Sequence, residues 1–376
     1  MNRFAALFIA IFGLSQPIAA DVILSKDEIA QTLSYGPWPL NFEKDPSNIA
    51  SGNPDAIAMG KALFFDPSLS SDGTLSCASC HDSAQDFTDG RARAEGRALL
   101  DRNTQSLWNL RAYRWFGWAG ASDSLWAHNI RPLLNRDEMG QSFEGVRDTL
   151  LSHEVRETFT AIFGDPKVMS AERVTVNVAK SLAAYLETLN TGETSFDRFR
   201  AALEAQDWTK AADYPIAAQR GLQIFIGTGR CSFCHSGPAF TNSEFHDAGV
   251  PYFIDQGRVD EGRFGAIKEL RKNPFTLAGP YSDDPDKTGA WAVNTLRFQH
   301  SDFGIFRTPS LRGAAKTAPY MHDGSLTDLR DVLDHYNEIN MDRLHSDGEA
   351  ILRPLELSDA QLDDLETFLR TLSDDK

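Results

Sequence analysis

Two copies of the pattern Cys-x-x-Cys-His constrain this chain more than any other feature of its sequence. They use all four cysteines of the chain. The first copy contains Cys77, Cys80 and His81, and the second contains Cys231, Cys234 and His235. In this pattern two thiols one turn apart form thioethers with the vinyl groups of a haem, and the adjacent histidine reaches the iron. The sequence therefore predicts two covalently attached c-type haems, and it leaves no thiol for a disulfide.

A zinc site and a redox dithiol are the other common uses of paired cysteines. A zinc ribbon places its two cysteine pairs roughly 15–20 residues apart, whereas Cys231 follows Cys80 at a far greater distance. A thioredoxin-like pair does not explain a histidine directly after both motifs. Haem attachment is therefore the favoured interpretation.

The surroundings of the two motifs repeat as well. The stretches before them, 60–65 and 221–226, are both apolar and helical in pattern. Phe-Thr-Asp at 87–89 and Phe-Thr-Asn at 240–242 follow the two histidines at nearly equal distances. The chain therefore resembles one haem module used twice.

The rest of the pattern is mostly helical. Apolar residues recur at helical spacing from Val174 to Leu189 and from Leu362 to Leu372, and Ser358 with Gln361 forms a capping-box pattern before the second stretch. Strand-like alternation is scarce, and Gly- and Pro-rich stretches such as 273–284 predict long loops. We expect a mostly α-helical protein of two cytochrome-c-like haem domains with long loops.

The amino-terminal twenty residues have the pattern of a signal peptide. Arg3 precedes an apolar run at 4–14, and small residues end the segment before Asp21. The 376 residues, 41% of them apolar, suffice for two domains. We expect a signal peptide at 1–20, an amino-terminal haem domain at 21–200 and a carboxy-terminal haem domain at 201–376, with the division near 190–215.

Charge and hydropathy limit the kinds of partner that this chain can bind. No later stretch approaches the eighteen or so apolar residues of a membrane helix, so we expect no membrane span and an exported protein. The formal net charge of −16 disfavours nucleic acid as a partner. An acidic surface suits either the steering of a basic redox protein or solubility alone, and both interpretations stay open.

The function of a haem protein depends on the sixth iron position. Two strong axial ligands favour electron transfer, whereas an open position admits a small oxidant. No histidine lies between His81 and His128. A methionine ligand for either haem would have to be one of Met59, Met139, Met169, Met321 and Met341.

The order of these landmarks resembles the bacterial di-haem cytochrome c peroxidases and their relative MauG, which matures methylamine dehydrogenase. The resemblance covers nearly the whole mature chain. Besides the haem motifs, it rests on 102–104 (Arg-Asn-Thr), Trp118, 132–139, 306–312 and 317–324.

The resemblance implies that the haem on His81 is the peroxidatic one. In peroxidases that need reductive activation, a histidine on the following loop blocks the iron. The corresponding stretch here, 82–100, offers only arginines as bulky basic groups. In this respect the chain is similar to MauG and to the peroxidases that need no activation, which implies an open, five-coordinate iron.

Three residues correspond to the distal pocket of the family. Glu138 matches the acid–base carboxylate, which can move a proton from one peroxide oxygen to the other, and Pro132 matches a distal proline. His128 stands where the family usually has glutamine, and it is either a second proton carrier or only a hydrogen-bonding group. Without the resemblance, Glu138 in Arg-Asp-Glu-Met would be interpreted as a solvated surface charge.

For the second haem, Tyr336 corresponds to the methionine ligand of the peroxidases, and MauG has a tyrosine there. A phenolate ligand stabilises ferric iron and lowers the reduction potential. The helical spacing of Leu329, Leu333 and Tyr336 also fits an ordinary core tyrosine. Met321 and Met341 remain alternative ligands.

Two further roles are carried over from the family. Trp118 matches the tryptophan that bridges the two haems, although tryptophan is also a common core residue. Asn103, Thr317 and Pro319 match a calcium site between the domains, made of one side-chain oxygen and two carbonyls. A tight turn without metal would explain the same residues.

Three functions remain open, and the first two follow from the resemblance. The first is a periplasmic peroxidase that reduces hydrogen peroxide with electrons from a small donor, such as a cytochrome c or a cupredoxin, through the second haem. The second is a MauG-like oxidase that modifies aromatic residues of a partner protein. Gly229 stands where MauG has its partner-surface tryptophan, which argues against methylamine dehydrogenase as that partner. The third is an electron carrier with both irons fully ligated.

Overall fold

The computed structural model describes residues 22–255, 257–297, 299–341 and 351–373, and the predicted signal peptide at 1–20 lies outside them. Helices dominate these ranges, and the strands there are few and only two or three residues long. The mostly helical character predicted from the sequence is confirmed. None of the described helices is long and apolar enough to cross a bilayer.

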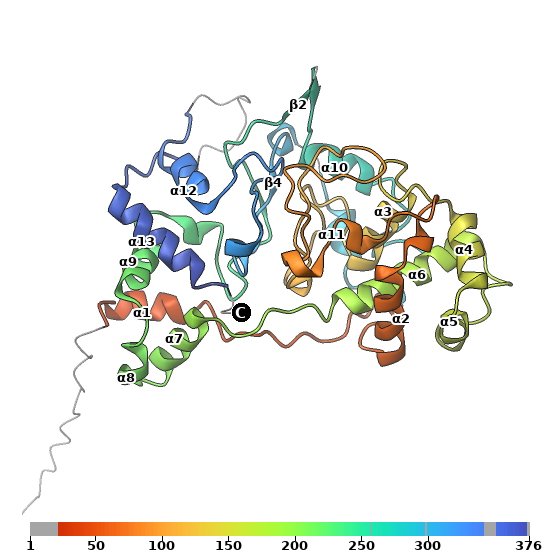
Figure 1. Cartoon of the computed structure of the whole chain (residues 1–376), viewed down its shortest axis with the longest axis horizontal. Coiled ribbons are helices and arrows are strands. Elements are labelled where there is room, and N and C mark those ends of the chain that lie inside the picture. Colours follow the sequence, from red (N-terminus) through yellow and green to blue (C-terminus); the bar gives the residue numbers. More distant parts are fainter. Residues whose placement is uncertain (1–21, 256, 298, 342–350, 374–376) are drawn as a thin grey trace, which may run out of the picture.

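The helices form two groups that lie side by side (Figure 1). The first helix group comprises α2 (Pro54–Phe65), α3 (Leu125–Leu134), α4 (Phe143–Ser152), α5 (Arg156–Phe163) and α6 (Ala171–Leu186). The second helix group comprises α1 (Lys26–Leu33), α7 (Ser195–Glu204), α8 (Trp208–Ala211), α9 (Ile216–Ile226), α12 (Leu329–Asn337) and α13 (Asp359–Arg370).

Helix α6 is the centre of the first helix group, and it confirms the helical pattern seen between Val174 and Leu189. It contacts α2, α3 and α4, and nearly all of its residues are buried. Burial includes Lys180, whose ammonium donates to the carbonyl oxygen of Tyr281 at 2.7 Å and to Asp283 at 2.5 Å. The loop at 273–284 therefore neutralises the one charge on the buried side of α6.

Helix α13 has the same role in the second helix group, where it packs against α9. It begins at the predicted capping box, in which the side chains of Ser358 and Gln361 each bond the backbone of the other. Its buried face consists of Leu362, Leu365, Phe368 and Leu369.

A glycine lies at a close helix crossing in each group. A Cβ atom on Gly60 of α2 would lie 1.9 Å from the carbonyl oxygen of Ser181, and one on Gly221 of α9 would lie 2.0 Å from that of Asp364. Both glycines open the apolar stretches that repeat before the haem motifs. The sequence repeat is therefore a repeat of packing: each motif follows a helix that crosses a second helix at backbone contact.

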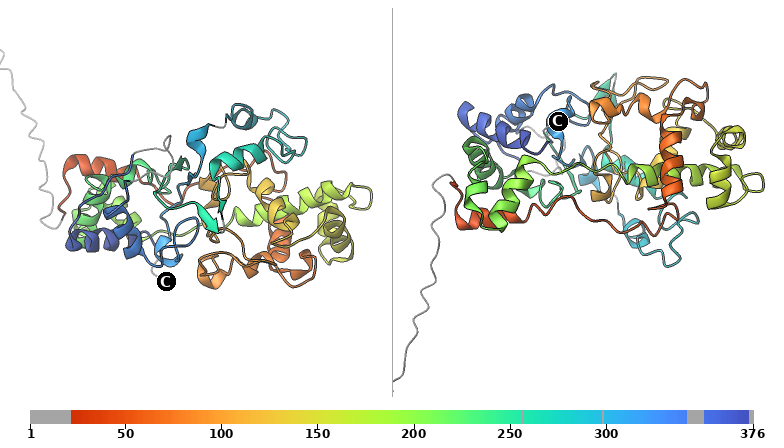
Figure 2. Two further views of the ribbon diagram at one scale, coloured as in Figure 1. Left: turned by 90° about the horizontal axis from the view of Figure 1, so that it is seen from above. Right: turned by 60° about the horizontal axis from the view of Figure 1, so that its bottom comes forward.

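The two hydrophobic cores are not separated along the chain. The first contains residues between Met59 and Leu189, whereas the second joins Val22, Leu24 and Tyr35 to residues between Phe196 and Leu372. Helix α1 contacts α7 and α9, and both views of Figure 2 show it within the second helix group. The predicted division near 190–215 stays a prediction, and residues of the stretch 22–35 pack with the second core.

A long excursion from the second helix group covers the first. It carries β1 (Phe245–His246), β2 (Phe253–Asp255), β3 (Arg258–Val259), α10 (Arg263–Leu270), α11 (Ala290–Asn294) and β4 (Phe306–Arg307). Strand β1 pairs antiparallel with β4, and β2 with β3. Arg102 forms two bonds of 2.7 Å to Asp260, and Arg263 donates to the carbonyl oxygen of Gly120 at 2.6 Å. These contacts hold the excursion against the segment that follows the first haem motif.

We expect Gly221→Ala to lower the free energy of unfolding by about 1–3 kcal/mol, because the added methyl group must push α9 away from α13. The measurement is chemical denaturation followed by circular dichroism. Gly265→Ala in α10 is the matched control, since its nearest neighbours are atoms of the flexible Glu261 side chain. Equal stability of the two variants would contradict the proposed role of the crossing.

Candidate haem sites

The two motifs share one backbone geometry. Cys77–Ser79 and Cys231–Phe233 each form a single 3₁₀ turn, after which the amides of His81 and His235 donate to the carbonyl oxygens of Cys77 and Cys231 at 3.0 and 2.9 Å. The turn places both cysteines and the histidine on one side of the chain, as covalent attachment to a porphyrin requires.

The Nδ1 atom of each histidine also contacts a backbone carbonyl oxygen. His81 Nδ1 lies 3.0 Å from the carbonyl oxygen of Phe87, and His235 Nδ1 lies 3.0 Å from that of Phe240. Both phenylalanines adopt left-handed backbone angles, with φ of 59° and 51°. A carbonyl acceptor places the proton on Nδ1, so that Nε2 carries the free lone pair that an iron needs.

Burial favours the neutral form of both imidazoles. It lowers the pKa of His81, and it lowers the pKa of His235 to about 4. Neutral imidazole is the form that ligates iron. In the described part of the chain, no three His, Cys, Asp or Glu side chains gather into a group that could hold a metal ion.

Each motif opens on a cavity that can hold a haem. The first cavity, of about 610 Å³, is lined by Cys77, Cys80 and His81. The second cavity, of about 580 Å³, is lined by Cys231, Cys234 and His235. Both volumes fall in the range of cofactor pockets, and their similarity is what two copies of one module predict. The residues present therefore fit two haems.

The predicted distal residues gather on one wall of the first cavity. His128, Pro132 and Glu138 all line it. His128 and Pro132 lie on α3, and Glu138 lies in the turn after it, where the amide nitrogen of Asn135 donates to Glu138 Oε1 at 2.7 Å. Glu138 is half-buried, so it is not the solvated surface charge that the local sequence alone suggested.

His128 is held neutral in this wall. Burial, together with the charges of Arg131, His81 and Arg307, lowers its pKa to about 3, and its buried Nδ1 has no hydrogen-bond partner among the described residues. A group with this pKa does not titrate near neutrality. The lowered pKa favours the neutral imidazole, which has one ring nitrogen that can donate and one that can accept a hydrogen bond.

The loop after His81 directs its arginines away from the first cavity. Arg91 pairs with Glu95, Arg93 with Asp101 at 3.1 Å, and Arg97 with Asp72 at 2.7 Å. The loop residues that line the cavity are small or apolar, namely Ala94, Gly96, Leu99 and Leu100. Among the described side chains of 82–100, no imidazole can block the iron.

Two candidate ligands reach the second cavity. Tyr336 and Met321 both line it, whereas Met341 is 48% exposed. Burial raises the pKa of Tyr336. Leu329 and Leu333 of the same helix are buried in the second core. Tyr336 thus lies on the same helix as these buried leucines and also lines the second cavity.

The other candidate methionines lie in the first helix group. Met59 is buried in the first core, Met169 packs against that core, and Met139 is buried at the wall of the first cavity. His246 of β1 lines the second cavity and was not singled out from the sequence, because an isolated histidine far from the motif carries no local signal.

One strip of chain forms a wall common to both cavities. Trp118 and Asn103 line the first and the second cavity, and Trp118 Nε1 donates to the carbonyl oxygen of Asn103 at 2.9 Å. The side-chain amide nitrogen of Asn103 donates to the carbonyl oxygen of Arg91 at 2.8 Å, so this bond does not use the side-chain oxygen of Asn103. Thr317 and Pro319 line the second cavity nearby.

Comparison with known proteins agrees with this geometry. Residues 54–205 match the family model described as di-haem cytochrome c peroxidase. The methylamine utilization protein MauG of Methylorubrum extorquens is 35% identical over 324 residues, covering 85% of this chain and 78% of that protein. The chain belongs to the di-haem cytochrome c peroxidase family. It is thus an oxidoreductase whose two motifs carry two c-type haems.

Peroxidases of this family are similar over the same span. The cytochrome-c peroxidase IdrP2 of Denitromonas iodatirespirans is 31% identical, covering 86% of this chain and 83% of that protein. Among solved structures, a MauG-like protein associated with microbial copper homeostasis superposes with a TM-score of 0.68 at 26% identity, covering 90% of this chain and 96% of that one.

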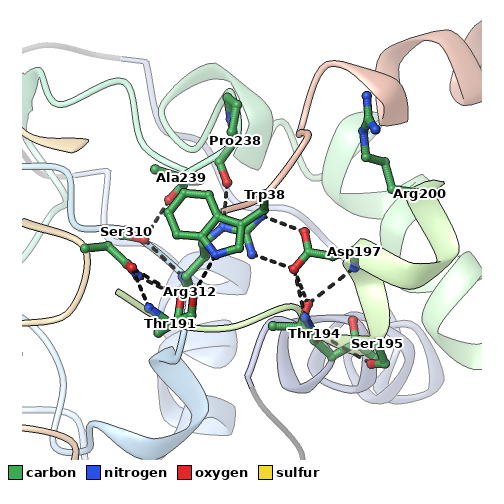
Figure 3. A network of polar contacts seen from close by, with 12 residues as sticks. Trp38, Thr191, Thr194, Ser195, Asp197, Arg200, Pro238, Ala239, Ser310 and Arg312 are labelled. Atoms are coloured by element: carbon green, nitrogen blue, oxygen red, sulfur yellow. Dashed lines mark hydrogen bonds and ion pairs between the residues drawn. The ribbon is translucent and has the colours of Figure 1, made fainter. Parts of the chain in front are cut away.

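A buried ion pair supports the second haem motif of this family member (Figure 3). Arg312 and Asp197 form two bonds of 2.8 and 2.9 Å, and both side chains are almost fully buried. The Arg312 guanidinium also donates to the carbonyl oxygen of Pro238 at 2.5 Å and lies over the ring of Trp38. Since Pro238 lies between His235 and Phe240, the pair fixes the loop that orients the iron ligand.

The sequence marked Arg312 only as part of a family segment and gave Asp197 no role. Asp197 forms a capping box with Thr194 at the start of α7, which is a signal that local sequence can give. Its second partner lies 115 positions away, and such a pairing is invisible without the fold.

We expect Arg312→Met to lower the free energy of unfolding by about 3–5 kcal/mol, because it leaves the Asp197 carboxylate buried and unpaired. Denaturant unfolding of the haem-loaded protein measures this. Lys210→Met, which breaks an exposed pair with Asp207, is the control and should leave stability nearly unchanged. A small effect at Arg312 would show that water replaces its partner.

Proposed function

We propose that this chain is a periplasmic peroxidase that reduces hydrogen peroxide to water at the haem on His81. Two electrons and two protons convert one peroxide molecule into two water molecules, and a small redox protein would supply the electrons through the haem on His235. The observation that carries the proposal is the half-buried Glu138 on the wall of a cavity that adjoins a second haem cavity across Trp118.

The two haems, when bound, supply the iron chemistry and the storage of electrons. Glu138 is positioned to take the proton from one peroxide oxygen and deliver it to the other, with Asn135 fixing the orientation of its carboxylate. Neutral His128 would orient peroxide by hydrogen bonding. The apolar loop residues that line the cavity would limit the access of water.

Further assignments follow from the family and complete the proposal. Tyr336 would be the distal ligand of the second haem, and Trp118 would carry electrons between the cavities. Asn103, Thr317 and Pro319 would hold a calcium ion at the interface of two cytochrome-c-like domains. The signal-peptide pattern at 1–20 supports export to the periplasm.

Oxidation of a partner protein, as in MauG, is the alternative outcome. At Gly229 a side chain would lie 2.8 Å from the carbonyl oxygen of Ile224, so the backbone there suits glycine and not the tryptophan of MauG. The peroxidase proposal fails if the purified di-haem protein does not oxidise reduced cytochrome c or cupredoxin in the presence of peroxide.

We expect Glu138→Gln to slow the reaction with peroxide by about 10²–10⁴-fold, because the amide cannot carry the proton. Stopped-flow absorbance after mixing with hydrogen peroxide measures this rate. Glu144→Gln in the first turn of α4 is the control, since Glu144 is exposed and lines neither cavity. Equal rates for both variants would remove Glu138 from the mechanism.

For the second haem, we expect Tyr336→Phe to abolish the low-spin ferric signal of one haem in electron paramagnetic resonance, because phenylalanine cannot ligate iron. Tyr281→Phe, which changes a tyrosine of the loop over α6, should leave the spectrum unchanged. An unaltered low-spin signal in Tyr336→Phe would instead favour Met321, and Met321→Leu would then remove it.

A further inference from the structure

Arg307 is a buried cation in the wall between the two cavities. It lies on β4, is only 3% exposed, and lines both cavities. Its backbone amide donates to the carbonyl oxygen of Trp118 at 2.7 Å. The backbone of Arg307 is therefore anchored beside the residue that the family places between the haems.

The guanidinium of Arg307 is incompletely satisfied by the protein. Its Nε donates to the carbonyl oxygen of Gly117 at 3.3 Å, and its central carbon lies 3.6 Å from the ring centroid of Tyr113. Its Nη1 is buried and has no hydrogen-bond partner among the described residues. An aromatic face and one long hydrogen bond offset little of the cost of burying a charge.

The other buried cations of the described chain are compensated. Lys180 pairs with Asp283, Arg200 with Glu204, and Arg312 with Asp197. Arg263 donates to the carbonyl oxygens of Ala119 and Gly120. No carboxylate of the described residues forms an ion pair with Arg307, and an uncompensated buried guanidinium is strongly unfavourable. The site therefore calls for an anion that the chain itself does not provide.

We propose that Arg307 binds the carboxylate of a haem propionate at this shared wall and thereby raises the reduction potential of that haem. A guanidinium offers two parallel donors that match a carboxylate. Its positive charge disfavours ferric iron relative to ferrous iron, which is one of the means by which a protein sets a haem potential. The proposal rests on haem attachment alone and does not depend on the peroxidase reaction.

The test compares the haem-loaded variants Arg307→Met and Arg307→Lys with the wild type. Spectroelectrochemical titration gives the midpoint potential of each haem, and resonance Raman spectroscopy gives the propionate bending bands. We expect Arg307→Met to shift one haem to lower potential and to shift its propionate band. Arg307→Lys should keep most of the potential, because the charge remains, and should still shift the band, because the fork of donors is lost.

Arg173→Met is the matched control. Arg173 also stacks on a tyrosine, with its guanidinium 4.5 Å from the ring of Tyr281, and it lines neither cavity. This variant removes one positive charge and should leave both potentials and both bands in place. Equal potentials in Arg307→Met and Arg173→Met, at equal haem content, would overturn the proposal.

Two further outcomes are decisive. If a free anion occupies the site, the wild-type potential will vary with chloride at constant ionic strength while the propionate bands of both Arg307 variants stay fixed, and the propionate assignment will be wrong. If Arg307→Met does not retain haem, the band of Arg307→Lys decides, and an unshifted band overturns the proposal. If the wild type shows no peroxide turnover while the Arg307 variants show the expected shifts, only the proposed function is contradicted.

Discussion

The hydrogen bond from each haem-motif histidine to a backbone carbonyl is the contact on which both sites depend. A Cys-x-x-Cys-His turn fixes the backbone position of the histidine. The carbonyl of Phe87 or Phe240 fixes the tautomer of the imidazole, with the proton on Nδ1 and Nε2 free. The acceptor must be a carbonyl that turns back toward the ring, and the left-handed backbone of both phenylalanines makes that turn. The Phe-Thr-Asp/Asn pattern thus repeats in the sequence because its phenylalanine carbonyl orients the histidine of each haem motif.

The same contact is supported differently in the two modules. The loop of the second motif is tied through Arg312 and Asp197 to the start of α7. The loop of the first motif is tied by a hydroxyl, since Ser106 Oγ donates to the carbonyl oxygen of Asp86 at 2.7 Å. A duplicated module has therefore kept its iron-facing geometry while the supports behind it have diverged.

Much of this architecture could be predicted from the sequence, because it rests on local patterns. The haem motifs, the helices around Val174 and Leu362 and the capping box at Ser358 all depend on residues close in the chain. The gathering of Glu138, His128 and Pro132 on one wall was reached through the family resemblance, since one helix and its following turn carry all three. Local spacing alone had left Glu138 as a surface charge.

What could not be predicted depends on contacts between distant segments. The interleaving of 22–35 with the second core, the pairing of Arg312 with Asp197 and the buried Arg307 in the shared wall all require the fold. The sequence shows that an arginine is present but not whether a carboxylate faces it. For the same reason His246 passed unnoticed until the second cavity brought it near His235.

The interleaved second core also orders the assembly of the chain in time. Val22, Leu24 and Tyr35 lie at the start of the described chain, whereas Leu362 and Phe368, which belong to the same core, lie near its end. The buried residues of the first core, from Met59 to Leu189, lie between these two stretches. The first core can therefore form while residues 22–35 still lack their contacts with α13, so that this segment is among the last parts of the described chain to fold.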